Sequence, residues 1–484
     1  MTEIINNRES SSSSRNIDND KHPLNIVEHS RDLKSNCTLF IGFTKEINQL
    51  NNNNNIDYYY NCEINNINEI VINENVSNVV FSLCCVNKRV FESCVLYERI
   101  ASSNADTLEF RCNVRLKAGS IPSNVTTIHF SEAFNEELEV GCLPVNLRHL
   151  EFKCGFTKLL RPGVLPPSLK VLKLRYYNKK FLRGVLPNGL ETLEFFCRDS
   201  NIDDAVLPPT LLTLSGIPST WLKHIKSLTN IRNIALYRQN TNINLSNIPN
   251  TVIDYQLGLY SDDFKLTGQL PSSIQYLDLG TCELDSFINQ NNNNNSSNNN
   301  DNNVNEEQKD DYYYHFPDNL LNLVIGFSSL QKISPGMIPN TVKDLTLSDN
   351  IIHSLQVGSI PDSVEILRLG GNCESIPSNV IPASVKRLTI NIEYFLNNTI
   401  NSLPATIETI VVQFHRLSNV YSFDIRRIDI QQNNNSNNND ENDNINPNYQ
   451  SILMLGGKSD IEGGFINMDN FQKQIIEIIN NRFK

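Results

Sequence analysis

The segment most like a phosphate-binding loop lies near the C-terminus, where Gly457, Lys458 and Ser459 follow one another. A P-loop also requires a glycine five residues before the Gly-Lys pair, but position 452 is isoleucine. Without that glycine, the loop lacks part of the backbone that cradles phosphates. We therefore interpret the segment as a glycine-rich turn between two short strands, at 452–455 and 465–468, and expect no nucleotide site.

The eleven cysteines and eight histidines show none of the spacings that build metal sites or nucleophilic centres. Cys84 and Cys85 are adjacent, the other cysteines are scattered without a C-x-x-C pair, and the histidines are isolated. H-E-x-x-H, G-x-S-x-G and kinase motifs do not occur, and no two carboxylates stand out as an acid/base pair. We expect buried free thiols, no metal site, no cofactor and no catalytic residue, and hence a protein that is not an enzyme.

Basic residues are concentrated in one stretch of this acidic chain. Ten of them lie between Arg148 and Arg183, and Glu151 is the one acidic residue in that interval. The ten are Arg148, Lys153, Lys158, Arg161, Lys170, Lys173, Arg175, Lys179, Lys180 and Arg183. Such a run is either a solvated charged face or a docking surface for an acidic protein or anionic lipid headgroups.

The composition narrows the location and the partners. The 484 residues carry a formal net charge of −12, so phosphates repel the chain as a whole and we expect no nucleic-acid partner. No apolar run approaches the roughly 18 residues of a membrane span, and the N-terminal MTEIINNRESSSSR does not resemble a secretory signal. Together with the odd number of cysteines, these features predict a cytoplasmic protein with free thiols and no integral membrane segment.

A repeat organises the chain between about residues 100 and 430. Its pattern is G-x-[IL]-P-x-[ST]-[VIL]-x-x-L-x-[LIF], as in GCLPVNLRHLEF from Gly141 and GSIPDSVEILRL from Gly358. Most successive marker prolines lie 21 or 22 residues apart. The marker prolines are Pro122, Pro144, Pro166, Pro187, Pro208, Pro249, Pro271, Pro317, Pro339, Pro361, Pro382 and Pro404.

Two gaps between marker prolines exceed one turn. The gap from Pro208 to Pro249 is 41 residues and holds a degenerate turn with Thr229 at the proline position. The gap from Pro271 to Pro317 is 46 residues, which is one 22-residue turn plus a 24-residue Asn-rich insert at about 289–312. This gives about thirteen clear turns, and we predict weaker turns at 102–110 and 422–430.

The spacing within each turn predicts one short β-strand. Alternation in V-x-x-L-x-L is typical of a half-buried strand, and stacked turns bury a continuous apolar column. Proline precedes the strand because it cannot donate to the ladder, and glycine allows a tight corner. A second apolar column lies three residues before the glycines, at Leu116, Leu138, Leu160, Phe181, Ile333 and Leu355. We therefore predict a repeat solenoid, with a leucine-rich-repeat-like curved parallel β-sheet and an irregular or extended back face.

These repeats resemble the FNIP repeat family, a short relative of the leucine-rich repeat. The family pattern is Phe-Asn, then Leu, then Gly-x-[IL]-Pro-x-Ser-Val-x-x-Leu-x-[LF]. The best match has Phe134-Asn135, Leu138, Gly141, Leu143-Pro144, Leu147, Leu150 and Phe152. Tyr177-Asn178 is a near match, and most other turns keep the proline and leucine positions but lose the Phe-Asn pair. The resemblance covers about residues 100–430 and implies an interaction surface without naming its partner.

The segments outside the repeats differ in composition. We expect a disordered polar tail at 1–35, an N-terminal cap region at 36–100, the solenoid at 101–430, an Asn-rich linker at 431–450, and a C-terminal strand-turn with a short helix at 451–484. Polar Asn and Ser tracts bury too little apolar surface to offset the entropy of ordering them.

Side chains that alternate with the buried strand leucines are predicted to point outward from the concave face of the sheet. On three neighbouring turns these are His149, Glu151, Lys153, Lys173, Arg175 and Glu194. We take the basic members, His149, Lys153, Lys173 and Arg175, as candidate partner-binding residues.

Two functions fit these features. The leading hypothesis is a non-enzymatic protein–protein interaction scaffold whose solenoid surface binds a protein partner, with an acidic partner favoured by the basic stretch. The alternative is a substrate-recognition adaptor of a larger complex such as a ubiquitin ligase. That role requires a second docking module, and 36–100 shows no F-box-like helical pattern.

Overall fold

The structure is a computed structural model. It describes residues 37–42, 58–61, 72, 74–82, 94–196, 202, 207–237, 242–258, 266–280, 316–326, 333–348, 355–370, 376, 379–397, 403–416, 419–428, 451–455 and 464–466. The chain divides into two compact units, unit 1 from Met1 to Ile217 and unit 2 from Pro218 to Lys484.

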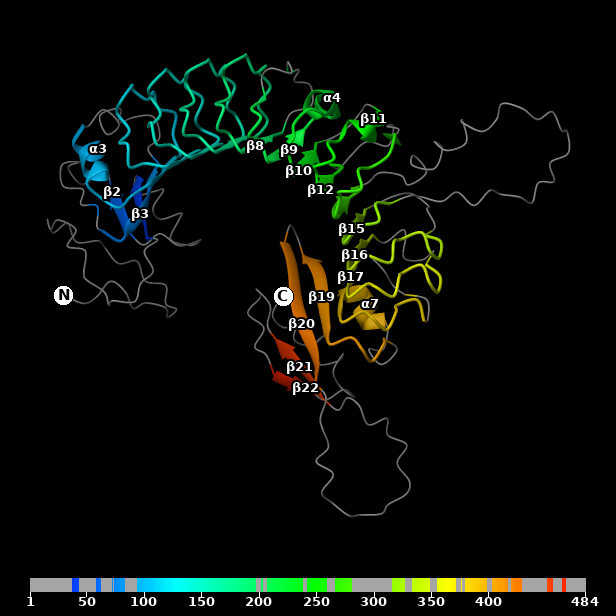
Figure 1. Cartoon of the computed structure of the whole chain (residues 1–484). Helices are drawn as coiled ribbons and strands as arrows, with labels where there is room; N and C mark the ends of the chain where they lie inside the picture. Colours follow the sequence, from blue (N-terminus) through cyan, green and yellow to red (C-terminus); the bar gives the residue numbers. More distant parts are fainter. Residues whose placement is uncertain are drawn as a thin grey trace, which may run out of the picture. The chain divides into compact units, whose positions relative to one another are not determined.

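Unit 1 is a parallel sheet to which each turn of the chain adds one strand. β1 (Cys37–Gly42) lies between β2 (Tyr58–Asn61) and β3 (Val76–Phe81), and helix α3 (Cys94–Ala101) follows β3 in the chain. The later strands then pair in chain order: β4 (Thr107–Phe110), β5 (Thr127–Phe130), β6 (His149–Phe152), β7 (Val171–Leu174), β8 (Thr192–Phe195) and β9 (Thr213–Ile217). Within this unit, the strands lie along the inner side of an arc and the return segments along its outer side (Figure 1).

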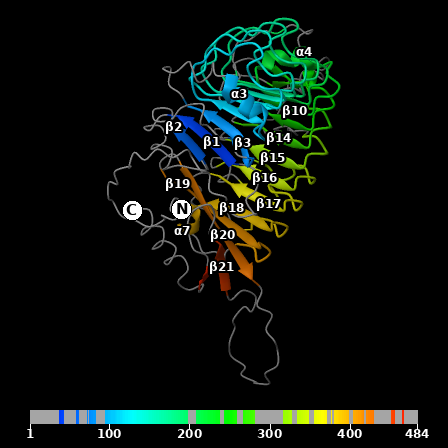
Figure 2. The same cartoon turned by 90° about the vertical axis from the view of Figure 1, so that its left-hand side faces the viewer.

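Unit 2 also adds one parallel strand with each turn. After η3 (Ser219–Trp221) and α4 (Leu222–Ile225), its parallel strands are β10 (Asn233–Leu236), β12 (Asp254–Gln256), β14 (Tyr276–Asp278), β15 (Asn322–Ile325), β16 (Asp344–Leu347), β17 (Ile366–Leu369), β18 (Arg387–Asn391) and β19 (Thr409–Arg416). Figure 2 shows β14 to β18 side by side.

The return segments of unit 2 contain short elements of their own. They are η4 (Leu245–Asn247), α7 (Ile392–Asn397) and a separate parallel pair formed by β11 (Ile243–Asn244) and β13 (Leu266–Thr267). After β19 the pairing becomes antiparallel through β20 (Asn419–Ile428), β21 (Ser451–Leu455) and β22 (Gly464–Ile466). The predicted strands on either side of the C-terminal glycine-rich segment are thus present as an antiparallel pair.

The core consists of columns of side chains that run across the stacked turns. Leu150, Leu172 and Leu193 are buried and face one another in register, as the proline spacing predicted. A column of stacked rings follows the same strands, with centroids 5.1, 5.4 and 4.9 Å apart along Phe81, Phe110, Phe130 and Phe152. The predicted second column is also buried, at Leu116, Leu138, Leu160, Phe181, Ile333 and Leu355. Each turn therefore buries its apolar residues mainly against its two neighbours.

The other consensus residues shape the turn that precedes each strand. The carbonyl of Pro144 accepts a hydrogen bond from the N–H of Leu147 at 3.1 Å, and the other marker prolines with described turns do the same. The hydroxyl of Ser168 lies 2.6 and 2.8 Å from the carbonyl oxygens of Val145 and Leu147 in the preceding turn. Gly141 has a φ of 82°, in the left-handed region that other residues avoid. Proline thus opens the turn, serine ties it to its neighbour and glycine permits the corner.

The Phe-Asn pair joins consecutive turns on the return side. The side-chain oxygen of Asn113 accepts the N–H of Asn135 at 2.8 Å, and that of Asn135 accepts the N–H of Thr157 at 2.9 Å. The ring of Phe134 is buried against Phe130, with centroids 3.9 Å apart. The asparagine thus pairs a backbone N–H that has no strand partner, and the phenylalanine fills the core.

The sheet starts earlier and ends differently than predicted. β3 pairs in register with β4, so the parallel array includes part of the segment expected to be a cap. The predicted last turn at 422–430 is wrong, because β20 runs antiparallel to β19 and Asp424 lies opposite Val411. A nearly immediate reversal after Arg416 leaves no return segment in which a parallel crossover could form.

The middle insert does not interrupt the sheet. β14 and β15 pair directly, with Leu277 opposite Leu323, although 44 positions separate Asp278 from Asn322. The predicted insert at 289–312 lies outside the described residues, as do the tail at 1–35, the linker at 431–450 and the predicted C-terminal helix. Trp221 is buried, in agreement with its prediction as a packing residue.

Candidate partner-binding face

The strand face of unit 1 is the side of the sheet opposite the return segments, and it presents three columns of side chains. The central column contains the residues between the two buried positions of each strand: Glu109, His129, Glu151, Lys173, Glu194 and Ser215. A second column begins the strands, at Thr107, Thr127, His149, Val171, Thr192 and Thr213. A third follows the strands, with Arg111, Ser131, Lys153, Arg175 and Phe196. These columns arise because alternate side chains of a strand point to opposite faces.

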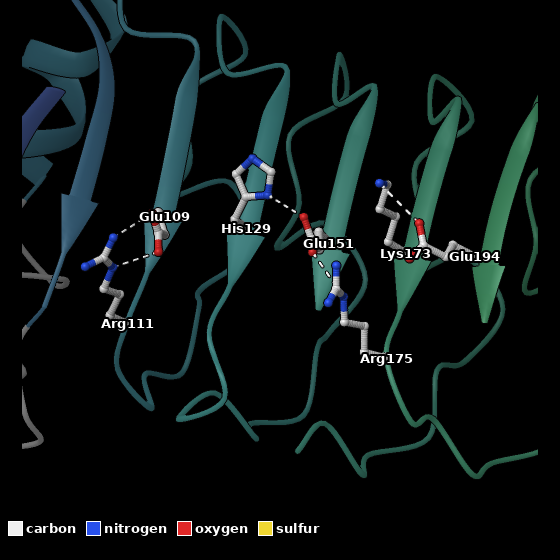
Figure 3. Close-up of polar contacts among 7 residues, drawn as sticks. All are labelled: Glu109, Arg111, His129, Glu151, Lys173, Arg175 and Glu194. Atoms are coloured by element: carbon white, nitrogen blue, oxygen red, sulfur yellow. Dashed lines mark hydrogen bonds and ion pairs between the residues drawn. The ribbon is translucent and has the colours of Figure 1, made fainter. Parts of the chain in front are cut away.

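Acidic side chains pair with basic ones along and between these columns (Figure 3). Arg111 Nε lies 2.7 Å from a carboxylate oxygen of Glu109 within the same turn. Glu151 is shared, because His129 Nδ1 lies 3.2 Å from one of its oxygens and Arg175 Nε lies 3.6 Å from the other. One strand further on, Lys173 Nζ lies 3.2 Å from Glu194.

The structure brings the four candidate residues together on two adjacent strands and their ends. His149 is the first residue of β6 and Lys153 follows that strand, while Lys173 lies within β7 and Arg175 follows it. Lys173 and Arg175 have the carboxylate partners just given. His149 and Lys153 are exposed, and the described residues include no ion-pair partner for either. These basic side chains therefore differ, because two of them already pair with a carboxylate and two, among the described residues, do not.

More basic residues of this stretch pair with carboxylates than the sequence interval 148–183 indicates. Arg161 pairs with Glu137 at 2.8 Å and Lys170 pairs with Glu191 at 2.7 Å. These carboxylates lie outside 148–183 in sequence but on adjacent turns in space. Since stacked turns place residues 21–24 positions apart side by side, a search at that offset would have found these pairs.

Two aromatic residues beside the candidates were not singled out from the sequence. Tyr176 follows Arg175 and is 58% exposed, and its ring centroid lies 6.5 Å from that of half-buried Phe196. Both rings follow the strand ends of neighbouring turns, on the side where Lys153 and Arg175 lie. The signal in the sequence was the placement of Phe196 in the third column, where the preceding turns have Ser131, Lys153 and Arg175.

The strand face of unit 2 has a different charge pattern. Burial raises the pKa of the carboxyl groups of Asp254 and Asp278, in β12 and β14. Arg368 pairs with Asp344, and Arg387 pairs with Asp424 at 3.4 Å. On the described part of the unit 2 face the arginines are paired with aspartates, whereas Lys153 on the unit 1 face is exposed and has no ion-pair partner among the described residues.

No group of three or more His, Cys, Asp or Glu residues among the described positions could hold a metal ion. Cys112, Cys142 and Cys154 are free, and burial raises the pKa of the Cys142 thiol to about 11, which keeps it protonated and weakly nucleophilic at neutral pH. None of the described helices has the length and apolar character needed to cross a bilayer.

Comparison with a family model agrees with the repeat architecture. A family model described as FNIP Repeat matches residues 113–155, 156–197 and 327–372. Among solved structures, the chain is similar to CroV588, described as a novel circular LRR protein, with 19% identity and a TM-score of 0.41 over 70% of this chain and 53% of that one. The chain thus spans about half the length of that structure. No curated protein matches it.

The stacked parallel strands, the columns of leucines and the inter-turn hydrogen bonds define a solenoid of the leucine-rich-repeat type. Within this class, the matched segments and the Phe134-Asn135 turn identify the repeats, and the chain carries FNIP repeats.

Proposed function

We propose that the protein is a non-enzymatic interaction scaffold that binds a protein partner on the strand face of unit 1. The observation that carries this proposal is the grouping of His149, Lys153, Lys173 and Arg175 on β6 and β7 or directly beside them. A rigid sheet holds these side chains at fixed spacings, and solenoids use such extended faces for recognition. The partner is acidic at the positions that meet Lys153 and Arg175.

The ion pairs of this face are weak enough for a partner's carboxylate to compete with the glutamates. Side chains of Lys173 and Arg175 are 38% and 47% exposed, so solvent screens their pairs with Glu194 and Glu151. Exposed pairs of this kind contribute about 0–1 kcal/mol to stability. A partner carboxylate can therefore displace or join the glutamate at little cost, while Lys153 is available without any exchange.

The adaptor role is not part of this proposal. The described residues of 36–100 form β1, β2, β3 and the start of α3, and these strands pair with the sheet of unit 1.

Charge reversal at Lys153 tests the proposal. Affinity purification of the intact chain would identify a partner, and the purified pair would then be titrated at several salt concentrations. We expect Lys153→Glu to weaken binding about tenfold at low salt and less at high salt, because it replaces attraction by repulsion at a screened site. Lys158→Glu makes the same charge change in the return half of the same turn and should bind like the parent.

The double variant Lys173→Gln/Arg175→Gln extends the test without placing new carboxylates beside Glu151 and Glu194. It should also weaken binding while the thermal midpoint changes little. Equal affinity of the parent, Lys153→Glu and the double variant at low salt would show that this face is only a solvated charged surface.

A further inference from the structure

The strand ends beside Arg175 combine cationic and aromatic side chains. Lys153 follows β6, Arg175 and Tyr176 follow β7, and Phe196 follows β8. The backbone N–H groups of Lys153 and Arg175 still bond to the preceding turn, at 2.8 Å to Phe130 and 3.1 Å to Phe152. These residues therefore belong to the rigid edge of the sheet and are not carried by a free loop.

We propose that Tyr176 and Phe196 form an aromatic anchor site, next to Lys153 and Arg175, for an acidic protein segment that carries an apolar side chain beside its carboxylates. This inference deepens the proposed function and rests on it. The apolar side chain of the partner packs against the two rings, and its carboxylates face the lysine and the arginine. Aromatic residues in such positions often carry a large share of interface binding energy.

The two rings are held in place before any partner arrives. Their centroids lie 6.5 Å apart at an interplanar angle of 40°, within the range of an attractive aromatic pair. Phe196 also reaches over the next turn, because a Cβ at Gly216 would lie 2.9 Å from its Cδ1 atom. Glycine at 216 thus leaves the space that the ring occupies. A platform that is already ordered loses less conformational entropy on binding.

Tyr176 occupies its position at a conformational cost. Its φ is 59°, in the left-handed region where Gly and Asn are the residues of choice. Tyr176 lies in the connection between the last strand residue, Leu174, and the next buried ring, Tyr177. This connection is one residue shorter than the connection from Phe152 to Phe156 in the preceding turn. A tyrosine at this position exposes 58% of its surface instead of filling the core. Folding alone does not favour this residue, so we assign its ring to recognition.

The alternating charges of the face favour a polypeptide over a polyanion. Glu109, Glu151 and Glu194 alternate with His129 and Lys173 along the central column. A phosphate backbone or an anionic bilayer would place negative charge over these glutamates as well as over the lysines. A protein segment has charges at discrete positions and an apolar side chain for the rings, so it meets both features.

The test uses the intact chain and a displayed library of short random linear peptides. Enriched peptides are synthesised and titrated by fluorescence anisotropy against the parent, Tyr176→Asn, Tyr176→Phe and Lys153→Glu. Val357→Ser, which alters a 67% exposed apolar residue in unit 2, is the control. Because asparagine tolerates the left-handed region, Tyr176→Asn should unfold at the same temperature as the parent or higher.

We expect enriched peptides to contain Asp or Glu next to an aromatic residue or leucine. Tyr176→Asn should weaken their binding at least about tenfold, and Tyr176→Phe and Val357→Ser should bind like the parent. If Lys153→Glu weakens binding but Tyr176→Asn does not, the anchor site is wrong and the basic face stands. If neither variant matters, or no peptide is enriched, both proposals fail for this face. Binding of phosphatidylserine vesicles that depends on Tyr176, without peptide binding, would identify a membrane surface and overturn the peptide proposal.

Discussion

Asn135 shows how one side chain connects two turns of the solenoid. Its side-chain oxygen accepts the N–H of Thr157 at 2.9 Å, and its amide nitrogen lies 3.1 Å from the threonine hydroxyl. Asn135→Ala removes both contacts and leaves the N–H to water. We expect a loss of about 1 kcal/mol in the free energy of unfolding, measured by chemical denaturation.

Asn178 offers a matched control for this prediction. It holds the equivalent position after Tyr177, but among the described residues its side chain has no hydrogen bond. Asn178→Ala should therefore be nearly neutral. An equal loss in the two variants would mean that asparagine contributes there through its backbone preference and not through a bond between turns.

The candidate residues illustrate what can be predicted at the scale of single side chains. The alternation of the strand placed His149, Lys153, Lys173 and Arg175 beside one another, because strand geometry alone fixes which face a residue occupies. Their ion pairs with Glu151 and Glu194 depend on the offset between turns and on rotamers. Tyr176 depends further on a connection shortened by one residue, which no repeat pattern encodes.

At the scale of elements, glycines after the strands of unit 2 allow adjacent turns to approach closely. A Cβ added to Gly326 would lie 1.8 Å from the carbonyl oxygen of Gly280. The contact is with backbone, so no side chain can rotate away. We expect Gly326→Ala to lower the free energy of unfolding by about 1–3 kcal/mol, as overpacking does, with increased hydrogen exchange in β14 and β15.

Gly370 is the corresponding residue after β17, and it provides the control. A Cβ there would lie 3.6 Å from the carbonyl oxygen of Leu347, an ordinary van der Waals contact. Gly370→Ala should therefore change stability by less than about 1 kcal/mol. Similar effects of the two alanines would mean that the turns can shift apart without cost.

The proline register predicted the strands because a consensus proline, serine and glycine each have a fixed task in the turn. It did not extend to two segments in which those residues are missing. Val76, Val79 and Phe81 of β3 repeat the V-x-x-L-x-F spacing, yet no proline precedes them. The segment at 422–430 has the alternation of a strand, but most of it belongs to β20, which follows β19 after a two-residue connection. Alternation indicates a strand and not its direction, so the antiparallel pairing of β20 could not be predicted from it.

On the scale of the whole array, stability depends on contacts between successive turns. Leu367 is 0% exposed and lies in register between Leu345 and Leu388. Leu367→Asp buries a charge without a partner, and we expect a loss of several kcal/mol. Because turns couple mainly to their neighbours, hydrogen exchange should rise first in β16, β17 and β18.

Thr346→Asp is the control for Leu367→Asp, because it introduces the same group on the strand face of β16, opposite Arg368 in register. It should leave the melting temperature nearly unchanged. A Leu367→Asp variant that melts like the parent, or that loses protection evenly throughout the chain, would contradict the model of locally coupled turns.

The insert at 289–312 tests whether unit 2 is one array on both sides of an interruption. Leu277 and Leu323 are paired in register, and the N–H of Leu279 donates to the carbonyl of Val324 at 3.0 Å, so the flanking turns are already neighbours. Deletion of these 24 residues reduces the 46-residue gap from Pro271 to Pro317 to 22, the length of an ordinary turn. The free-energy cost of closing a loop grows only with the logarithm of its length. We therefore expect the shortened chain to fold, to remain in solution and to melt within a few degrees of the parent. A variant with the same 24 residues replaced by a Gly-Ser sequence separates length from composition. If the replacement folds while the deletion aggregates, the return path needs the extra length; if both unfold, the insert is a structural element and the array is two domains divided near residue 300.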